Sequence, residues 1–344
     1  MAKLLCLHIG TPKSGTTYLQ EWAGTNATGL LEQGVLWPDL DRYPIIRDLA
    51  GRPKLESDLG RWAEFCRHVR DFPGTVLFSN EMMVTLQAPS IERIVEETGV
   101  SGVVVVVTAR DLGRVIPSQW QTSIRNGSTI KWTDYAGAIC RQHPNDLEGR
   151  QLERHLAFWG KHDLTEVCQR WEEVLGASTV RIVTVPRESS DVRTLTERFS
   201  LAAGFSAAGL PVPEESLNTS LGAHSAELLR LLNADLKDAN RIVRKHAFRD
   251  MLAKIVMTQR ASIEPRYGLT AEQTEVIAGR SEEISDRLTR MQVPIFGDLR
   301  DLVPSVGEAE HAAYPEDATS TELLAAARYG IVGLLELLAR PTPE

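Results

Sequence analysis

The sequence predicts an α/β protein with a parallel central sheet and flanking helices. Short apolar runs alternate with stretches of helical spacing, and a glycine-containing loop joins the first run to the first helical stretch. Five consecutive valines, residues 103–107, are typical of a central strand that is covered on both faces. Strands separated by helices favour a doubly wound parallel sheet, because parallel neighbours need long crossover connections.

The elements can be followed along the chain. An apolar extended run at residues 4–9 leads through loop 10–17 into a helix that starts near Tyr18. The elements expected further on are strands at 74–79, 103–108 and 180–185 and a helix over 112–123. Together they supply the alternation of strand and helix that the fold class requires.

Helical spacing dominates the later half of the chain, from about residue 218 to residue 300. We expect one buried apolar face there, formed by Leu228, Leu229, Leu232, Leu236, Ala239, Ile242 and Val243. The expected organisation is a single α/β domain over 1–305, a linker over 306–321, and a C-terminal helix and tail over 322–344, with the helix ending near residue 340.

Composition excludes several classes of protein. With 344 residues, 42% hydrophobic and 24% charged, the chain is neither disordered nor collagenous. A formal net charge of -8 argues against the dominant basic surface of many nucleic-acid binders, so an anion needs a local site. No apolar run reaches the roughly 20 residues of a membrane span, so no transmembrane segment is expected.

The four cysteines are widely spaced and form no Cys-x-x-Cys pair. Cys6 lies within the first apolar run, as a buried structural thiol would. This pattern indicates reduced thiols, and we expect a cytoplasmic protein on that ground.

The loop after the first strand carries the clearest chemical signal. It reads Gly10-Thr-Pro-Lys-Ser-Gly-Thr-Thr17 and opens a helix, where backbone N–H groups and the helix dipole favour an anion. Gly10 and Gly15 have the separation of a Walker A loop, but Thr16 stands where that loop has lysine. The lysine is instead Lys13, inside the loop, which predicts a phosphate site other than that of a nucleotide triphosphatase.

Two motifs resemble those of the PAPS-dependent sulfotransferases. The stretch Pro12-Lys-Ser-Gly-Thr-Thr17 looks like the 5′-phosphosulfate loop of that family at every position. The family's second motif is a strand that ends in arginine and is followed by a helix with a serine; residues 103–110 and Ser118 match it. The resemblance covers the N-terminal third of the chain and implies a P-loop-like sulfotransferase fold.

The resemblance also implies a role for each matching residue, with PAPS as the co-substrate and no metal. Lys13 would stabilise the leaving phosphate oxygen and the transferring sulfuryl group. The 5′-phosphate would be bound by the other loop residues, Pro12, Ser14, Gly15, Thr16 and Thr17. Arg110 and Ser118 would bind the 3′-phosphate, for which a planar guanidinium and a hydroxyl are suitable donors.

Sulfuryl transfer also needs a group that accepts a proton from the incoming nucleophile. Glu81 is our choice, because it directly follows the expected strand 74–79, and the family places a histidine or glutamate base on a comparable segment. His8 is the alternative base. His143, His155 and His162 are expected on the surface, and no histidine has the spacing of a zinc ligand.

The expected activity is in-line transfer of a sulfuryl group from PAPS to a hydroxyl of a small molecule or glycan, which leaves PAP, with an amine as the second choice. The helical region 218–300 would then wall the acceptor site. A P-loop kinase of small metabolites is one alternative, which Asp111 keeps open as a magnesium ligand. A non-catalytic module that binds PAP is another, and the apolar C-terminal helices could form a homodimer face.

Overall fold

A computed structural model describes residues 4–187, 193–213, 220–305 and 313–339. The chain forms two compact units, each assembled from three segments. The segments of the first unit are Met1–Asp111, Ala157–Ser216 and Arg280–Val303, and those of the second are Leu112–Leu156, Leu217–Gly279 and Pro304–Glu344. The range 1–305, predicted as one domain, therefore contains residues of both units.

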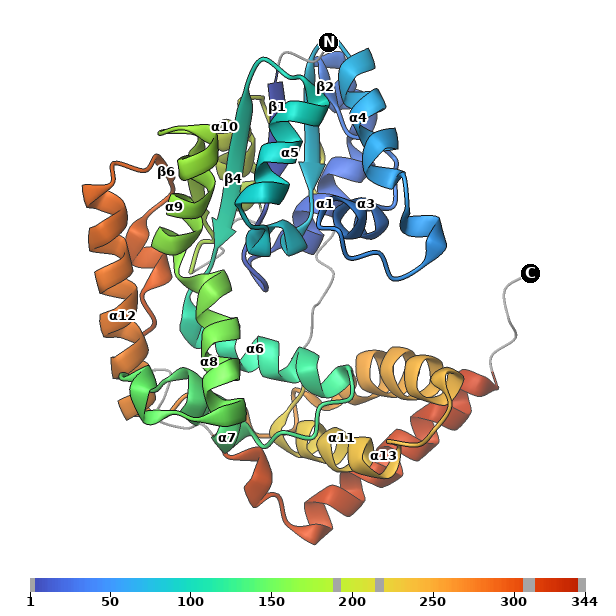
Figure 1. Ribbon diagram of the computed structural model, residues 1–344. Helices are drawn as coiled ribbons and strands as arrows, with labels where there is room; N and C mark the ends of the chain where they lie inside the picture. Colours follow the sequence, from blue (N-terminus) through green and yellow to red (C-terminus); the bar gives the residue numbers. More distant parts are fainter. Residues whose placement is uncertain (1–3, 188–192, 214–219, 306–312, 340–344) are drawn as a thin grey trace. The chain divides into compact units, whose positions relative to one another are not determined.

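The first unit contains a sheet of six parallel strands in the order β2-β3-β1-β4-β5-β6 (Figure 1). The strands are β1 (Leu4–His8), β2 (Val35–Leu36), β3 (Thr75–Ser79), β4 (Val103–Ala109), β5 (Val180–Thr184) and β6 (Ile295–Phe296). The α/β class and the parallel sheet predicted from the sequence are confirmed. The four longer strands lie where the apolar runs predict them, whereas β2 and β6 have only two residues each and were not predicted.

Helices cover both faces of this sheet, as the unbroken valine run of β4 requires. On one face, Val104 and Val106 belong to a core shared with α1 (Thr16–Thr25) and α10 (Arg193–Ala203). On the other, Phe78 of β3 lies 4.5 Å from Phe65, ring centre to ring centre. The helices that pack together on that side are α4 (Arg61–Asp71), α5 (Ala88–Thr98) and α9 (Leu164–Leu175).

Shorter elements complete the first unit. These are α2 (Ala27–Glu32), α3 (Arg42–Leu49), η1 (Glu56–Asp58), η2 (Glu81–Thr85) and η6 (Leu299–Leu302). The residues of α8 (Gly149–His162) and α12 (Ala271–Arg290) are divided between the two units.

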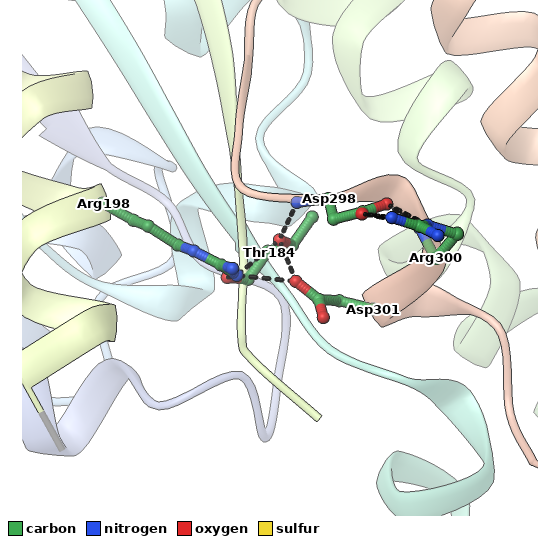
Figure 2. A network of polar contacts seen from close by, with 5 residues as sticks. All are labelled: Thr184, Arg198, Asp298, Arg300 and Asp301. Carbon is green, nitrogen blue, oxygen red and sulfur yellow. Dashed lines mark hydrogen bonds and ion pairs between the residues drawn. The ribbon is translucent and has the colours of Figure 1, made fainter. Parts of the chain in front are cut away.

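A polar network fixes the β6 edge of the sheet (Figure 2). The Asp301 carboxylate accepts from the Thr184 hydroxyl at 2.7 Å and pairs with Arg198 at 2.6 Å. The backbone N–H of Asp298 donates to the same Thr184 hydroxyl at 3.1 Å, and the Asp298 carboxylate pairs with the exposed Arg300. These contacts join α10, the end of β5 and η6. They stabilise the edge of the sheet at β6, a strand of only two residues.

The second unit is helical. Its remaining elements are α6 (Leu112–Arg125), α7 (Trp132–Ile139), η3 (Pro144–Asp146), α11 (Ala223–Asp235), the π-helix η4 (Val243–Val256), η5 (Met257–Arg260), η8 (Pro315–Asp317) and α13 (Ser320–Leu338). Helix α13 packs its small residues on η4: a Cβ on Gly333 would lie 2.5 Å from Val256 Cγ1. The predicted helices over 112–123 and from residue 322 are confirmed, and residues 306–312 of the predicted linker lie outside the described residues.

One predicted apolar face is wrong in part. Helix α11 ends at Asp235, and the chain turns before η4 begins. The Asn240 side chain accepts a hydrogen bond from the Val243 N–H at 3.0 Å, which starts the next helix in a new direction. Ile242 is 70% exposed and Val243 is 36% exposed, so neither continues the buried face of α11.

Among the described residues, no helix is both long and apolar enough to cross a membrane.

Candidate functional site

The glycine loop lies at the C-terminal edge of the sheet, between β1 and α1. Beyond β1, the Ile9 N–H donates to Val106 O and the Thr11 N–H donates to Thr108 O, both at 2.9 Å. The loop thus follows β4 before it turns into α1. Ligands of open α/β sheets bind at this edge of the strands.

Two glycines shape the loop for different reasons. A Cβ on Gly10 would overlap the Thr108 hydroxyl and stand 2.7 Å from Thr16 Oγ1, so only glycine fits there. Gly15 has φ 85°, in the left-handed region, as has Lys13 with φ 69°. Ser14, between them, lies outside that region. A backbone that alternates between right-handed and left-handed conformations can direct successive N–H groups toward one anion.

The start of α1 has polar groups that lack hydrogen-bond partners among the described residues. Its N-cap residue, Gly15, provides no side-chain cap for the first N–H groups. Thr16 Oγ1 is buried, its residue being only 6% exposed, and has no hydrogen-bond partner among the described residues. A helix N-terminus with open N–H groups and an orphaned hydroxyl fits a phosphate or sulfate group.

A buried chain of polar side chains lies beneath the loop. His8 Nε2 is 3.0 Å from Thr108 Oγ1, which is 2.7 Å from Ser14 Oγ. On its other side, His8 Nδ1 is 2.8 Å from Ser79 Oγ, which accepts from the Gln20 amide at 3.1 Å. The chain joins three strands to the loop and to α1. Ser79, Gln20 and Thr108 were not predicted from the sequence.

His8, the alternative base, is inaccessible to a substrate. Its side chain is 0% exposed, and its ring packs edge-on against Phe199 at 4.9 Å. Burial lowers the pKa of His8 to about 3, so the imidazole is neutral at physiological pH. Both ring nitrogens already have hydroxyl partners within the protein.

Glu81 lies one strand away from the loop at the same edge. The Asn80 N–H donates to His8 O at 3.0 Å, which places the end of β3 beside β1. Asn80 caps η2 by accepting from the Met82 N–H, and half-buried Glu81 is the first residue of that helix. Glu81 is thus half-buried at this edge of the sheet, whereas His8 is fully buried.

Tyr43 of α3 is a neighbour of Glu81 that was not predicted from the sequence. Its hydroxyl donates to Glu81 Oε1 at 3.0 Å. Partial burial, followed by the nearby carboxylate, raises the pKa of Tyr43 to about 12, so the phenol keeps its proton across the physiological range. No local pattern links residues 43 and 81, because the contact joins elements far apart in sequence.

Arg110 directly follows the last residue of β4, the strand beside β1. The first unit therefore brings the loop motif, Glu81 and Arg110 to one edge of the sheet. Ser118 belongs to the second unit, on α6, and stays a prediction of the sequence.

The surface positions predicted for His155 and His162 are wrong. His155 is 2% exposed and His162 is 3% exposed, whereas His143 is exposed as predicted. His155, Phe158 and His162 recur at helical spacing along α8 and share its apolar side. His162 stacks on Phe158 at 4.4 Å, and burial lowers the pKa of His162 to about 3. Their seven-residue separation is the signal that could have predicted this.

The described residues contain no group of three or more His, Cys, Asp or Glu side chains that could hold a metal ion. All four cysteines are buried and free, as predicted.

The chain was compared with family models, curated proteins and solved structures. No family model, no curated protein and no solved structure matches it. The candidate site therefore rests on the residues of this chain alone: a glycine loop, an arginine and a carboxylate at the C-terminal edge of one parallel sheet.

Proposed function

We propose that this protein is a PAPS-dependent sulfotransferase with a P-loop-like fold, which transfers a sulfuryl group to an acceptor hydroxyl. One observation carries the proposal. The two motifs that resemble the sulfotransferase family lie far apart in the sequence, yet they follow the adjacent parallel strands β1 and β4. Two motifs that bind the two phosphates of one nucleotide must lie close together in the fold.

The start of α1 fits the 5′-phosphate of such a nucleotide. Open N–H groups at Gly15, Thr16 and Thr17 can donate to phosphate oxygens, and Thr16 Oγ1 lacks a partner among the described residues. Half-buried Lys13 adds a cation in the same loop. We assign Pro12 to the shape of the loop rather than to donation, because proline has no N–H.

Arg110 suits the 3′-phosphate, because a guanidinium can donate two parallel hydrogen bonds to one phosphate. The resemblance implies a second donor, Ser118, eight residues further on. We propose Arg110 as the group that distinguishes PAPS from nucleotides without a 3′-phosphate.

PAPS supplies an activated sulfuryl group. During transfer, the bond between sulfur and the phosphate oxygen breaks, a bond between sulfur and the acceptor oxygen forms, and the acceptor loses its proton. Lys13 would stabilise the negative charge that develops on the departing phosphate oxygen. Glu81 would take the acceptor proton. The formal net charge of -8 favours a small-molecule or glycan acceptor without dense negative charge.

Calorimetric titration with PAP, and with ATP in parallel, tests the nucleotide site. We expect PAP to bind without magnesium and at least tenfold more tightly than ATP, since only PAP presents a 3′-phosphate to Arg110. Magnesium-dependent binding of ATP in preference to PAP would replace this proposal with a kinase. No binding of either nucleotide would remove the nucleotide site altogether.

Lys13→Ala then separates binding from chemistry. We expect turnover of PAPS with an accepted hydroxyl substrate to fall about a thousandfold, while PAP affinity falls far less, because the main contact of Lys13 forms as charge develops. Lys54→Ala is the matched control, since Lys54 is exposed in the same unit. Equal losses of binding and turnover would contradict the role given to Lys13.

A further inference from the structure

The hydrogen atoms of the buried chain beneath the loop can be placed by elimination. Thr11 O can only accept, so the Ser14 hydroxyl donates its one proton there, over 2.6 Å. Ser14 Oγ must then accept from the Thr108 hydroxyl at 2.7 Å. With its own proton used, Thr108 must accept from His8 Nε2 at 3.0 Å.

The other end of the chain follows from the same logic. Because His8 carries its proton on Nε2, the unprotonated Nδ1 accepts from the Ser79 hydroxyl at 2.8 Å. Ser79 Oγ in turn accepts from the Gln20 amide at 3.1 Å. Each hydroxyl and the ring N–H then has one acceptor, and the Gln20 amide donates to both Ser79 Oγ and Ser79 O. The fully buried imidazole is the neutral Nε2–H tautomer. Only a neutral ring can donate on one side and accept on the other.

This order of donors fixes Ser14 from within the protein. Ser14 is 0% exposed, and its hydroxyl proton is committed to Thr11 O. Its neighbours Lys13 and Gly15 both have left-handed backbone, which is unfavourable for lysine because of its Cβ. Such a conformation persists where the surrounding structure holds it, and Ser14 is the anchored residue at the centre of this turn.

We propose that His8 is a positioning residue of the anion loop: through Thr108 it anchors the Ser14 hydroxyl, and the anchored serine holds the turn that presents Lys13 and the α1 amides to a phosphate. The inference rests on the proposed function of the loop. It assigns Ser14 to the interior of the loop, where its hydroxyl supports the binding surface without donating to the ligand.

Removal of one hydroxyl tests the chain. Thr108→Val keeps the approximate shape of the side chain but disconnects His8 from Ser14, whereas Thr108→Ser keeps the hydroxyl. We expect Thr108→Val to weaken PAP binding at least tenfold in calorimetry, and Thr108→Ser to restore it to within about threefold of the wild type. The matched control is Thr98→Val, since Thr98 is buried in the same unit and its hydroxyl bonds only within α5.

His8 itself is tested by a double-mutant cycle. His8→Phe keeps an aromatic ring against Phe199 but removes both polar atoms. If the two residues act through one chain, His8→Phe combined with Thr108→Val weakens PAP binding no more than either change alone. Additive losses would mean independent effects and would overturn the proposal, as would a Thr108→Val protein with wild-type affinity.

Two measurements without ligand separate this inference from the proposed function. The nitrogen chemical shifts of His8 should identify the Nε2–H tautomer, and hydrogen exchange at the Thr11 and Ser14 amides should quicken in Thr108→Val but not in Thr98→Val. Failure of either overturns the positioning role even if PAP binds. If both measurements give the expected result but PAP does not bind, the buried hydrogen-bonded chain of side chains exists and the proposed function is wrong.

Discussion

Glu81, the proposed base, is in direct contact with Tyr43. The Tyr43 hydroxyl donates to the carboxylate at 3.0 Å, and its pKa of about 12 keeps that donor in place. We expect Glu81→Gln to lower turnover at least a hundredfold with PAP affinity unchanged, because the amide keeps the size of the side chain but cannot take a proton. Steady-state kinetics beside calorimetry checks both expectations.

Tyr43→Phe should lie between the wild type and Glu81→Gln, with a loss of turnover of about tenfold, because the carboxylate stays but loses the donor that orients it. Tyr314→Phe, which removes an exposed hydroxyl, is its control. A fully active Glu81→Gln enzyme would exclude Glu81 as the base, and the inaccessible His8 could not replace it.

The β1–loop–α1 element depends on the absence of a side chain at Gly10. A Cβ there would overlap Thr108 Oγ1 and come within 2.9 Å of His8 Nε2. We therefore expect Gly10→Ala to lower the free energy of unfolding by about 1–3 kcal/mol and to abolish PAP binding, since overpacking must push the loop off β4. Chemical denaturation and calorimetry measure the two effects.

Gly160→Ala provides the comparison within the same unit, because the added methyl group would meet no atom within 4 Å other than its chain neighbours and the adjacent backbone of its own helix. Alanine in a helix interior is favoured over glycine, so this variant should be as stable as the wild type or up to about 1 kcal/mol more stable. Wild-type stability and binding in Gly10→Ala would show that the loop can move away from β4 at little cost.

Elements differ in how far the sequence predicts them. The valine run of β4 and the Pro12–Thr17 loop are local patterns, so sequence places both correctly. The two-residue strands β2 and β6 have no pattern of their own and depend on neighbouring strands and on the Thr184–Asp301 network. The polar chain escaped prediction because His8 meets partners 71 and 100 residues away.

At the scale of the whole molecule, buried neutral histidines predict sensitivity to acid. The pKa values of His8 and His162 fall from 6.5 to about 3 on folding, so the unfolded chain binds more protons between these values. Stability from this source is complete above pH 6.5 and declines as the pH falls toward 3. Denaturant unfolding between pH 4.5 and 7 measures the slope.

Removal of either histidine should reduce that slope. We expect His8→Gln and His162→Phe each to remove about one proton from the uptake that accompanies unfolding near pH 5. An unaltered slope in both buried-site variants would mean that neither ring is held neutral by the fold.

All four cysteines are buried, so a thiol-specific label should not react with the native protein. Burial raises the pKa of Cys6 to about 12 and contributes most to the rise at Cys66, to about 11, so few thiolates form near neutral pH. A maleimide dye should leave the folded wild type unmodified and react with a cysteine introduced at exposed Ser57 or Thr321. With one dye on each unit, energy transfer can follow their separation as nucleotide is added, with every native residue kept except the two labelled positions.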